Sequence, residues 1–242
     1  MEIVNHASPN FGKRAIGFSV NLLLIHYTGM KTCTQALKRL SDPASGVSSH
    51  YLINETGVVY RLVDERYRAW HAGVSLWKGE TDINSLSIGI ELANPGHENG
   101  YQPFPEKQMS ALISLCRNIF ERYDIPHRRV LGHSDVAPGR KRDPGELFDW
   151  KSLADAGIGY WPRGERVASV FNPNAIKVWQ AKFKELGYGV QVTGKFDLDT
   201  KAVVTAFQRH WLPENISGKF DKETSSMLDQ MISDCSDIAN PE

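Results

Sequence analysis

The sequence contains little cysteine and no excess of charge of either sign. Its three cysteines, Cys33, Cys116 and Cys235, lie far apart among 242 residues and are odd in number. Neither a disulfide framework nor a Cys-x-x-Cys metal site is therefore indicated. The 28 Lys and Arg residues are balanced by 28 Asp and Glu residues. Because nucleic acids and anionic membranes are bound through an excess of basic residues, we expect neither as a partner.

Long hydrophobic runs are also absent. The apolar run over residues 20–25 is too short to cross a bilayer, and residues 1–14 lack the apolar centre of a signal peptide. The sequence has no Gly-x-Ser-x-Gly motif and no cysteine within a motif, which argues against a serine or cysteine hydrolase. We expect a soluble monomer without a transmembrane segment.

Short apolar segments alternate with helical patterns over residues 1–162. Apolar residues recur at three- and four-residue steps after Pro105, which predicts a helix up to Phe120. A second helix is predicted over 34–40. Strands interleaved with helices indicate the α/β or α+β class, with a central mixed β-sheet flanked by helices. The predicted strands are 20–26, 49–53, 57–63, 86–92 and 129–133, and the second and third form a hairpin with a Gly-containing turn.

A separate module is predicted after residues 163–172, which we interpret as a linker. Residues 193–200 recur as 217–224, and each copy ends in Asp-x-[Asp/Glu]-Thr before a helical pattern. Asp and Thr are typical helix caps, so the two copies are expected to form the same tight loop. The predicted organisation is a larger domain over 1–162, the linker over 163–172 and a small three-helix domain over 173–242.

Four residues in the larger domain are candidates for metal-dependent chemistry. His26 and His133 each end an apolar run, and Asp143 follows His133 by ten residues through a loop rich in Gly and Pro. A catalytic zinc ion is held by three such ligands with a fourth position open to water. Glu91 is a carboxylate inside an apolar strand, which is costly unless the group is paired or functional. At the open position it would act as a base for water.

Each candidate also has a structural explanation. His26 could be a hydrogen-bonded residue at a strand end, Glu91 a salt-bridged core carboxylate, and Asp143 a turn residue. The basic residues 139–142 could form a solvated loop. Residue spacing alone leaves the zinc site and these structural roles about equally open.

Five motifs then carry a resemblance to a known family: residues 25–28, 47–53, 69–73, 87–92 and 132–145. In order and spacing they resemble the zinc N-acetylmuramoyl-L-alanine amidases of the AmpD/AmiD type, related to T7 lysozyme and the peptidoglycan recognition proteins. The agreement extends from about residue 20 to 162. The segment from about 173 to 232 resembles the three-helix peptidoglycan-binding module.

The resemblance implies the chemistry of the site. It implies zinc (Zn2+) on His26, His133 and Asp143, Glu91 as the catalytic carboxylate and Lys141 as a second catalytic residue. The reaction implied is hydrolysis of the amide between N-acetylmuramic acid and L-alanine, in peptidoglycan or in muropeptides. The fold implied is a central mixed sheet with helices on its faces and zinc at the bottom of a groove.

Five further residues of these motifs or next to them are predicted to contact the substrate. Trp70 offers a flat apolar face for packing, and His71 can bond to peptide carbonyls. His50 has two equally weighted roles, substrate contact or support of the site from within the sheet. The full predicted set is Tyr27, His50, Trp70, His71 and Asn94.

One alternative function and two compartments remain open. A protein of this fold could recognise muropeptides without cutting them, but the complete ligand set disfavours that alternative. The wall-binding module suggests the periplasm or cell envelope, where it would hold the enzyme on polymeric wall or, alternatively, only pack on the first domain. The missing signal peptide suggests the cytoplasm.

Overall fold

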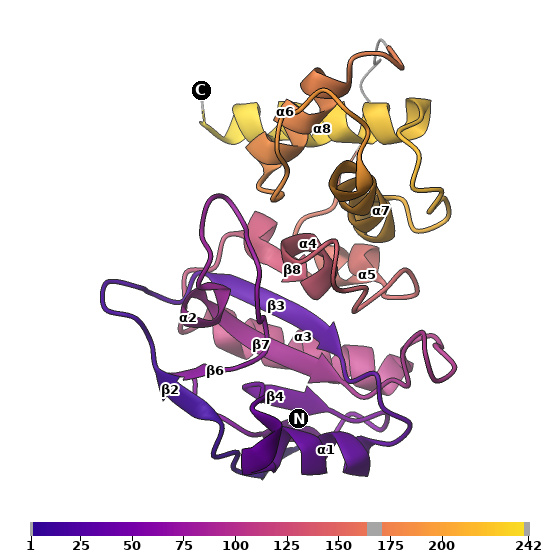
Figure 1. Cartoon of the computed structure of the whole chain (residues 1–242). Coiled ribbons are helices and arrows are strands. Elements are labelled where there is room, and N and C mark those ends of the chain that lie inside the picture. Colours follow the sequence, from indigo (N-terminus) through magenta and orange to yellow (C-terminus); the bar gives the residue numbers. More distant parts are fainter. Residues whose placement is uncertain (1, 164–170, 240–242) are drawn as a thin grey trace.

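The computed structural model describes residues 2–163 and 171–239, the last five of these without their side chains. Its centre is a six-stranded mixed sheet in the order β1-β5-β4-β7-β3-β8 (Figure 1). Within it β3 runs parallel to β7 and β8, and β4 pairs antiparallel with β5. The strands are β1 (Ile3–Asn5), β3 (Leu22–Tyr27), β4 (Tyr51–Ile53), β5 (Val59–Arg61), β7 (Ser87–Leu92) and β8 (Val130–Gly132). A separate antiparallel pair joins β2 (Phe11–Lys13) to β6 (Tyr67–Ala69).

The alternation of side chains along β3 builds two cores, one on each face of the sheet. Leu23 and Ile25 pack into the core that contains α3 (Glu106–Phe120). Leu22 and Leu24 pack into the other core, which extends into the C-terminal helices. His26 continues the second series, so its side chain belongs to the face opposite α3.

The other helices of this domain are short and surround the sheet. Helix α1 (Cys33–Ser41) begins after Thr32, whose side chain accepts from the backbone N–H of Gln35. Helices α2 (Ile83–Leu86), α4 (His133–Val136) and α5 (Trp150–Asp155) each span one or two turns. Two 3-10 turns lie at Pro43–Ser45 and His127–Arg129. Figure 1 shows α3 behind the sheet and α1 at the end of the domain farthest from the C-terminal helices.

The C-terminal module consists of α6 (Ile176–Leu186), α7 (Leu198–Trp211) and α8 (Lys222–Ala239). The expectation that its internal repeat forms one loop twice is confirmed. In each copy the Asp side chain accepts from a Thr backbone N–H at 2.8 Å, Asp197 from Thr200 and Asp221 from Thr224.

A glutamine completes each of these loops, a feature that the repeat pattern did not reveal. Oε1 of Gln180 accepts from the N–H of Gly194, and Oε1 of Gln208 accepts from the N–H of Gly218, both at 2.8 Å. Because each amide also donates to a carbonyl of its loop, both loops are tied to the preceding helix.

The module and the sheet share one continuous apolar core. Phe183, Tyr188 and Phe207 of the module belong to the same buried cluster as Leu24 and Val136. Figure 1 shows α7 lying directly over α4 and α5, beside the β8 edge of the sheet. The module is therefore packed against the first domain through an apolar interface. The predicted linker covers 163–172, and residues 164–170 lie outside the described part of the chain. The bounds of the linker therefore stay a prediction.

The predicted fold class and the five predicted strands are confirmed, with ends that differ by a few residues. The predicted hairpin is the β4–β5 pair, with Tyr51 opposite Arg61. The difference that bears on the site is at β8. This strand stops at Gly132, and His133 begins α4 instead of ending the strand. The strands β1, β2 and β6 were not predicted, because they are exposed or only partly buried over most of their length and have no apolar run that marks them.

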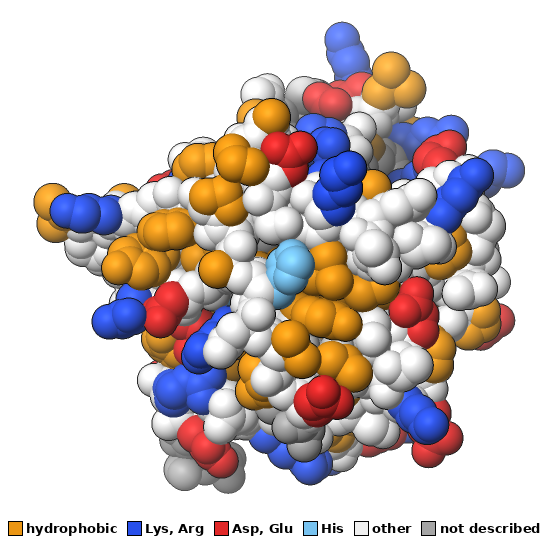
Figure 2. All heavy atoms as spheres, turned by 90° about the horizontal axis from the view of Figure 1, so that it is seen from below, with side chains coloured by type: hydrophobic (Ala, Val, Ile, Leu, Met, Phe, Trp, Pro, Cys, Tyr) orange, Lys and Arg blue, Asp and Glu red, His pale blue; other side chains and the backbone are white. Residues whose placement is uncertain are grey.

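The face of the molecule drawn in Figure 2 carries charges of both signs. In Figure 2, basic and acidic side chains are interspersed around one face, with hydrophobic side chains gathered near its middle. In the described parts of the chain, 2–163 and 171–239, no helix is both long and apolar enough to cross a membrane.

Candidate active site

Three predicted ligands converge at one end of the sheet. His26 comes from β3, His133 from the first position of α4, and Asp143 from the loop that follows this helix. The Nδ1 atoms of the two histidines are 2.9 Å apart, and each lies 3.0 Å from Oδ2 of Asp143. All three residues are buried. The sheet thus brings together groups that lie 107 and 117 residues apart in the sequence.

The arrangement fits a bound metal ion. Tetrahedral ligand atoms at the usual zinc distances are about 3.3 Å from one another, close to the separations seen here. The outer nitrogen of each histidine is also engaged: Nε2 of His133 donates to the carbonyl of Ala72 at 2.9 Å, and Nε2 of His26 lies 3.0 Å from Nδ1 of His71. Such outer contacts fix the tautomer and orientation of ligating histidines. His26, His133 and Asp143 can therefore hold a metal ion together.

The charges of the site also suit a cation. Burial lowers the pKa of His26 to about 4, so its imidazole is neutral near pH 7 and has a free lone pair. Burial alone would raise the pKa of Asp143, but His133 and His26 outweigh it and hold that pKa well below the usual range. The cluster thus presents a neutral imidazole at His26 and an ionised carboxylate at Asp143.

Glu91 faces the same space from the neighbouring strand. It lies directly opposite His26 in the β3–β7 register, so both side chains are on the same face of the sheet. Its Oε2 atom is buried and has no hydrogen-bond partner among the described residues. Burial raises the pKa of Glu91 well above its usual range, and the charge of Asp143 raises it further, whereas Lys141 lowers it. A carboxylate in such surroundings is a strong candidate for a proton acceptor.

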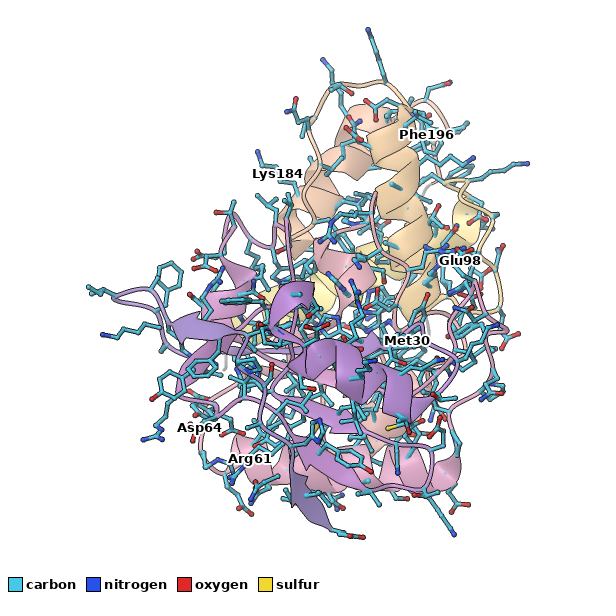
Figure 3. All side chains as sticks on the ribbon, turned by 60° about the horizontal axis from the view of Figure 1, so that its bottom comes forward. Met30, Arg61, Asp64, Glu98, Lys184 and Phe196 are labelled. Atoms are coloured by element: carbon cyan, nitrogen blue, oxygen red, sulfur yellow. The ribbon has the colours of Figure 1, made fainter. Side chains whose placement is uncertain are left out.

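The cluster opens into a cavity of about 350 Å³. Lys141 lines it from the same loop as Asp143, and Tyr27, Trp70 and His71 line it from other segments. The ring of Tyr27 is held by a 2.8 Å hydrogen bond between its hydroxyl and Nδ1 of His97. Met30 forms an apolar part of the cavity wall. Figure 3 shows this residue beside α1 and far from Phe196 of the module.

Two predicted substrate residues lie away from this cavity. His50 is fully buried; its Nδ1 accepts from the N–H of Gly89 at 2.9 Å and its Nε2 lies 3.1 Å from the carbonyl of Tyr67. Asn94 is also buried, and its amide donates to the carbonyl of Gln102 at 2.7 Å. Both side chains are occupied in holding the backbone near the site.

Arg140 is a site residue that the sequence analysis left within a basic loop. Its guanidinium donates to the carbonyls of Ala72 and Val74 at 2.6 and 2.7 Å. The first of these carbonyls is the one that accepts from His133. Its position directly before Lys141 in the longest motif is the only sequence signal that could have marked it.

Gly89 provides the space that His71 needs above the sheet. A Cβ atom at this position would lie 2.5 Å from Nδ1 of His71, the atom that faces His26. We expect Gly89→Ala to displace this ring, to lower the free energy of unfolding by about 1–3 kcal/mol and to weaken metal binding about 10- to 100-fold. Chelator competition and thermal unfolding measure both effects. The matched control is Gly139→Ala, whose added methyl would meet nothing within 4 Å; equal losses in the two variants would contradict the expectation.

Comparisons with known protein families match both parts of the chain. The N-acetylmuramoyl-L-alanine amidase family matches residues 17–146, and a peptidoglycan binding domain family matches residues 172–228. The N-acetylmuramoyl-L-alanine amidase AmiD of Escherichia coli (strain K12) is 38% identical over 232 residues, which cover 88% of this chain and 82% of that protein. The 1,6-anhydro-N-acetylmuramyl-L-alanine amidase AmpD of Haemophilus influenzae is 35% identical over 60% of this chain and 86% of its own length.

Solved structures show the same two-part architecture. The E. coli AmiD complex with anhydro-N-acetylmuramic acid-L-Ala-D-gamma-Glu-L-Lys matches with a TM-score of 0.79 and 34% identity, covering 92% of this chain and 93% of that one. AmpDh3 from Pseudomonas aeruginosa matches with a TM-score of 0.77 and 31% identity, covering 94% of each chain. The resemblance inferred from the five motifs is confirmed, and the chain belongs to the N-acetylmuramoyl-L-alanine amidase family.

Proposed function

We propose that this chain is a zinc-dependent hydrolase of the amide bond between N-acetylmuramic acid and L-alanine. The observation that carries the proposal is the convergence of His26, His133 and Asp143 in a cavity that Glu91 also lines, with the buried Oε2 atom of Glu91 free of hydrogen bonds among the described residues. Zinc held by the three ligands would act as a Lewis acid that activates water and polarises the scissile carbonyl.

Glu91 would accept the proton of the attacking water. Its position on the same sheet face as His26 puts it beside the ligand cluster, and its raised pKa makes it a better proton acceptor than an exposed glutamate. After attack it could return this proton to the departing amine of L-alanine. The lack of a competing hydrogen bond to Oε2 among the described residues supports this role.

Lys141 would stabilise the negative charge that develops on the carbonyl oxygen. It lies on the cavity wall two residues before Asp143, so one loop supplies a ligand and a cation. Tyr27 and Trp70 line the cavity and are proposed to contact the substrate. For His71, His50 and Asn94 the contacts favour support of the site, because each side chain already bonds to a ligand or to nearby backbone.

Removal of the Lys141 charge tests its role. We expect Lys141→Ala to lower kcat about 100- to 1000-fold, as for loss of one oxyanion partner, while zinc content stays unchanged. Lys141→Arg should recover part of the rate, since it keeps the charge. Lys151→Ala is the control, because Lys151 is exposed and bonds to Asp155 in its own helix. A full rate in Lys141→Ala would exclude this residue from catalysis.

The substrate can be identified with two preparations. The purified protein is incubated with anhydro-N-acetylmuramic acid-L-Ala-D-gamma-Glu-L-Lys and with intact peptidoglycan sacculi, with and without a chelator, and products are weighed by mass spectrometry. We expect release of peptides that begin with L-alanine, and loss of this release in the chelator. Binding without cleavage would favour the muropeptide-recognition alternative.

The C-terminal module supports action on polymeric wall. A binding module beside a catalytic domain raises the local concentration of substrate without changing the chemistry. We therefore propose the cell envelope as the compartment, with cleavage of sacculi in the assay above. Cleavage of soluble fragments alone would instead favour a recycling role in the cytoplasm.

A further inference from the structure

Asp135 is a buried carboxylate that links the proposed metal site to the C-terminal module. It is 0% exposed and lies two residues after His133. Its Oδ1 accepts from the hydroxyl of Tyr188 at 2.7 Å, and its Oδ2 lies 2.7 Å from Nδ1 of His210. Both partners belong to the module. A buried carboxylate requires such donors, because it has lost the hydrogen bonds of water.

On the other side, Asp135 holds the turn that carries two proposed ligands. Its Oδ2 accepts from the N–H of Gly132 at 2.8 Å, which fixes the start of α4 at His133. Two residues further on, the N–H of Ser134 donates to the carbonyl of Asp143 at 2.9 Å. The orientation of His133 and the backbone of Asp143 therefore depend on one short helix whose N-terminus is tied to Asp135.

The two module residues are themselves held rigidly. The ring of His210 stacks between Trp150 and Trp211, with ring centres 3.8 Å from each. The ring of Tyr188 packs edge-on against Trp77, with centres 5.0 Å apart, and lies in the shared apolar core. Neither side chain can turn away from Asp135 without disrupting this packing.

A second set of contacts involves the segment that contains Leu76 and Lys78, which bonds to α4 at the first residue and to the module at the second. The N–H of Lys78 donates to the carbonyl of Gly187 at 2.9 Å, and the N–H of Leu76 donates to the carbonyl of Val136 at 2.8 Å. The segment that contains Lys78 begins near Ala72, whose carbonyl accepts from Nε2 of His133. The module thus contacts both the turn that carries His133 and the segment that leads back to Ala72.

We propose that Tyr188 and His210 are positioning residues for the metal site, so that the C-terminal module completes the active centre in addition to any binding of wall. This inference rests on the proposed zinc chemistry. It differs from a simple packing role because it requires the module to set the affinity for zinc and the rate of the chemical step.

The test uses the full chain and three readouts. Tyr188→Phe removes only the hydroxyl, and His210→Leu removes the ring nitrogen. Zinc affinity is measured by competition with a chromogenic chelator, kcat and KM with the soluble anhydromuramyl tripeptide, and stability by thermal unfolding. We expect the double variant to bind zinc about 10- to 100-fold more weakly and to lose a similar factor in kcat, with KM little changed.

Two further variants separate positioning from stability. His210→Asn keeps an N–H donor near the place of Nδ1 and should restore zinc affinity relative to His210→Leu. Leu228→Ala removes a fully buried apolar side chain of α8, which has no polar group to bond to Asp135. It should lower the melting temperature but leave zinc affinity at the wild-type value when measured well below unfolding.

The outcomes are distinct. Wild-type zinc affinity and kcat in the double variant would overturn the inference, as would an equal loss of zinc affinity in Leu228→Ala. A wild-type protein that binds no zinc and cleaves nothing would instead overturn the proposed function. Weaker zinc binding in the double variant alone, with rescue by His210→Asn, would support the inference.

Discussion

Glu91→Gln is expected to abolish amide hydrolysis while leaving the metal in place. The substitution keeps the shape of the side chain but removes the group that would take a proton from water. Loss of a general base typically costs a factor of about 100 to 10,000 in rate, and we expect about 1000 here because burial has raised the pKa of Glu91 well above its usual range. The measurement is kcat on the soluble tripeptide, with zinc content determined on the same sample.

Two checks accompany this variant. Glu106→Gln makes the same chemical change at the exposed first turn of α3, where only a few tenths of a kcal/mol of stability are at stake, and should keep full activity.

The stability of the metal-free protein should also change with pH. A carboxyl whose pKa is raised on folding stabilises the fold at acid pH, and this contribution is lost as the pH rises through the raised value. Glu91→Gln should remove that part of the pH dependence. Turnover at the wild-type rate would exclude Glu91 as the base.

Asp143→Asn is expected to remove both zinc and activity. The amide has nearly the same shape, but it lacks the negative charge that His26 and His133 stabilise in the buried cluster. Zinc would then be held by neutral ligands only, and we expect its affinity to fall by more than about 100-fold, beyond the range for loss of an outer contact. Activity at limiting zinc should fall at least as far. Elemental analysis after dialysis and chelator competition measure the loss.

Asp149→Asn is the matched control for this variant. Asp149 lies six residues further along and caps α5, where its side chain accepts from the N–H of Ser152 at 2.9 Å. Asn caps helices about as well as Asp, so zinc content and rate should both stay at the wild-type value. An Asp143→Asn protein that keeps its zinc through dialysis would remove Asp143 from the ligand set.

Local patterns allowed most of the sheet and the main helices to be predicted. The apolar run before His26 and the repeated three- and four-residue spacing before Phe120 are signals contained within one segment each. The same holds for the two repeat loops, in which Asp197 and Asp221 cap helices as expected. The strands β1, β2 and β6 escaped prediction, because they exist through pairing with distant segments rather than through a pattern of their own.

The roles of the other histidines could not be read from the sequence. His50, His71 and His210 are chemically identical, yet one supports the β7 backbone, one touches His26 and one reaches Asp135 from another domain. A side chain's partner depends on which segments the fold brings within about 3 Å, and hydrogen bonding is too short-ranged to be encoded by local spacing.

The sequence by itself determined the kind of chemistry: two histidines, an aspartate and a glutamate in or after apolar segments, in motifs of one enzyme family. Only the tertiary structure decided how that chemistry is held. It gathers His26, His133 and Asp143 within 3.0 Å across more than 100 residues, and it brings His210 to Asp135 across 75 residues. The physical reason is that residue type and periodicity are local properties, whereas the convergence of ligands and the support of a buried carboxylate arise only when separate segments pack together.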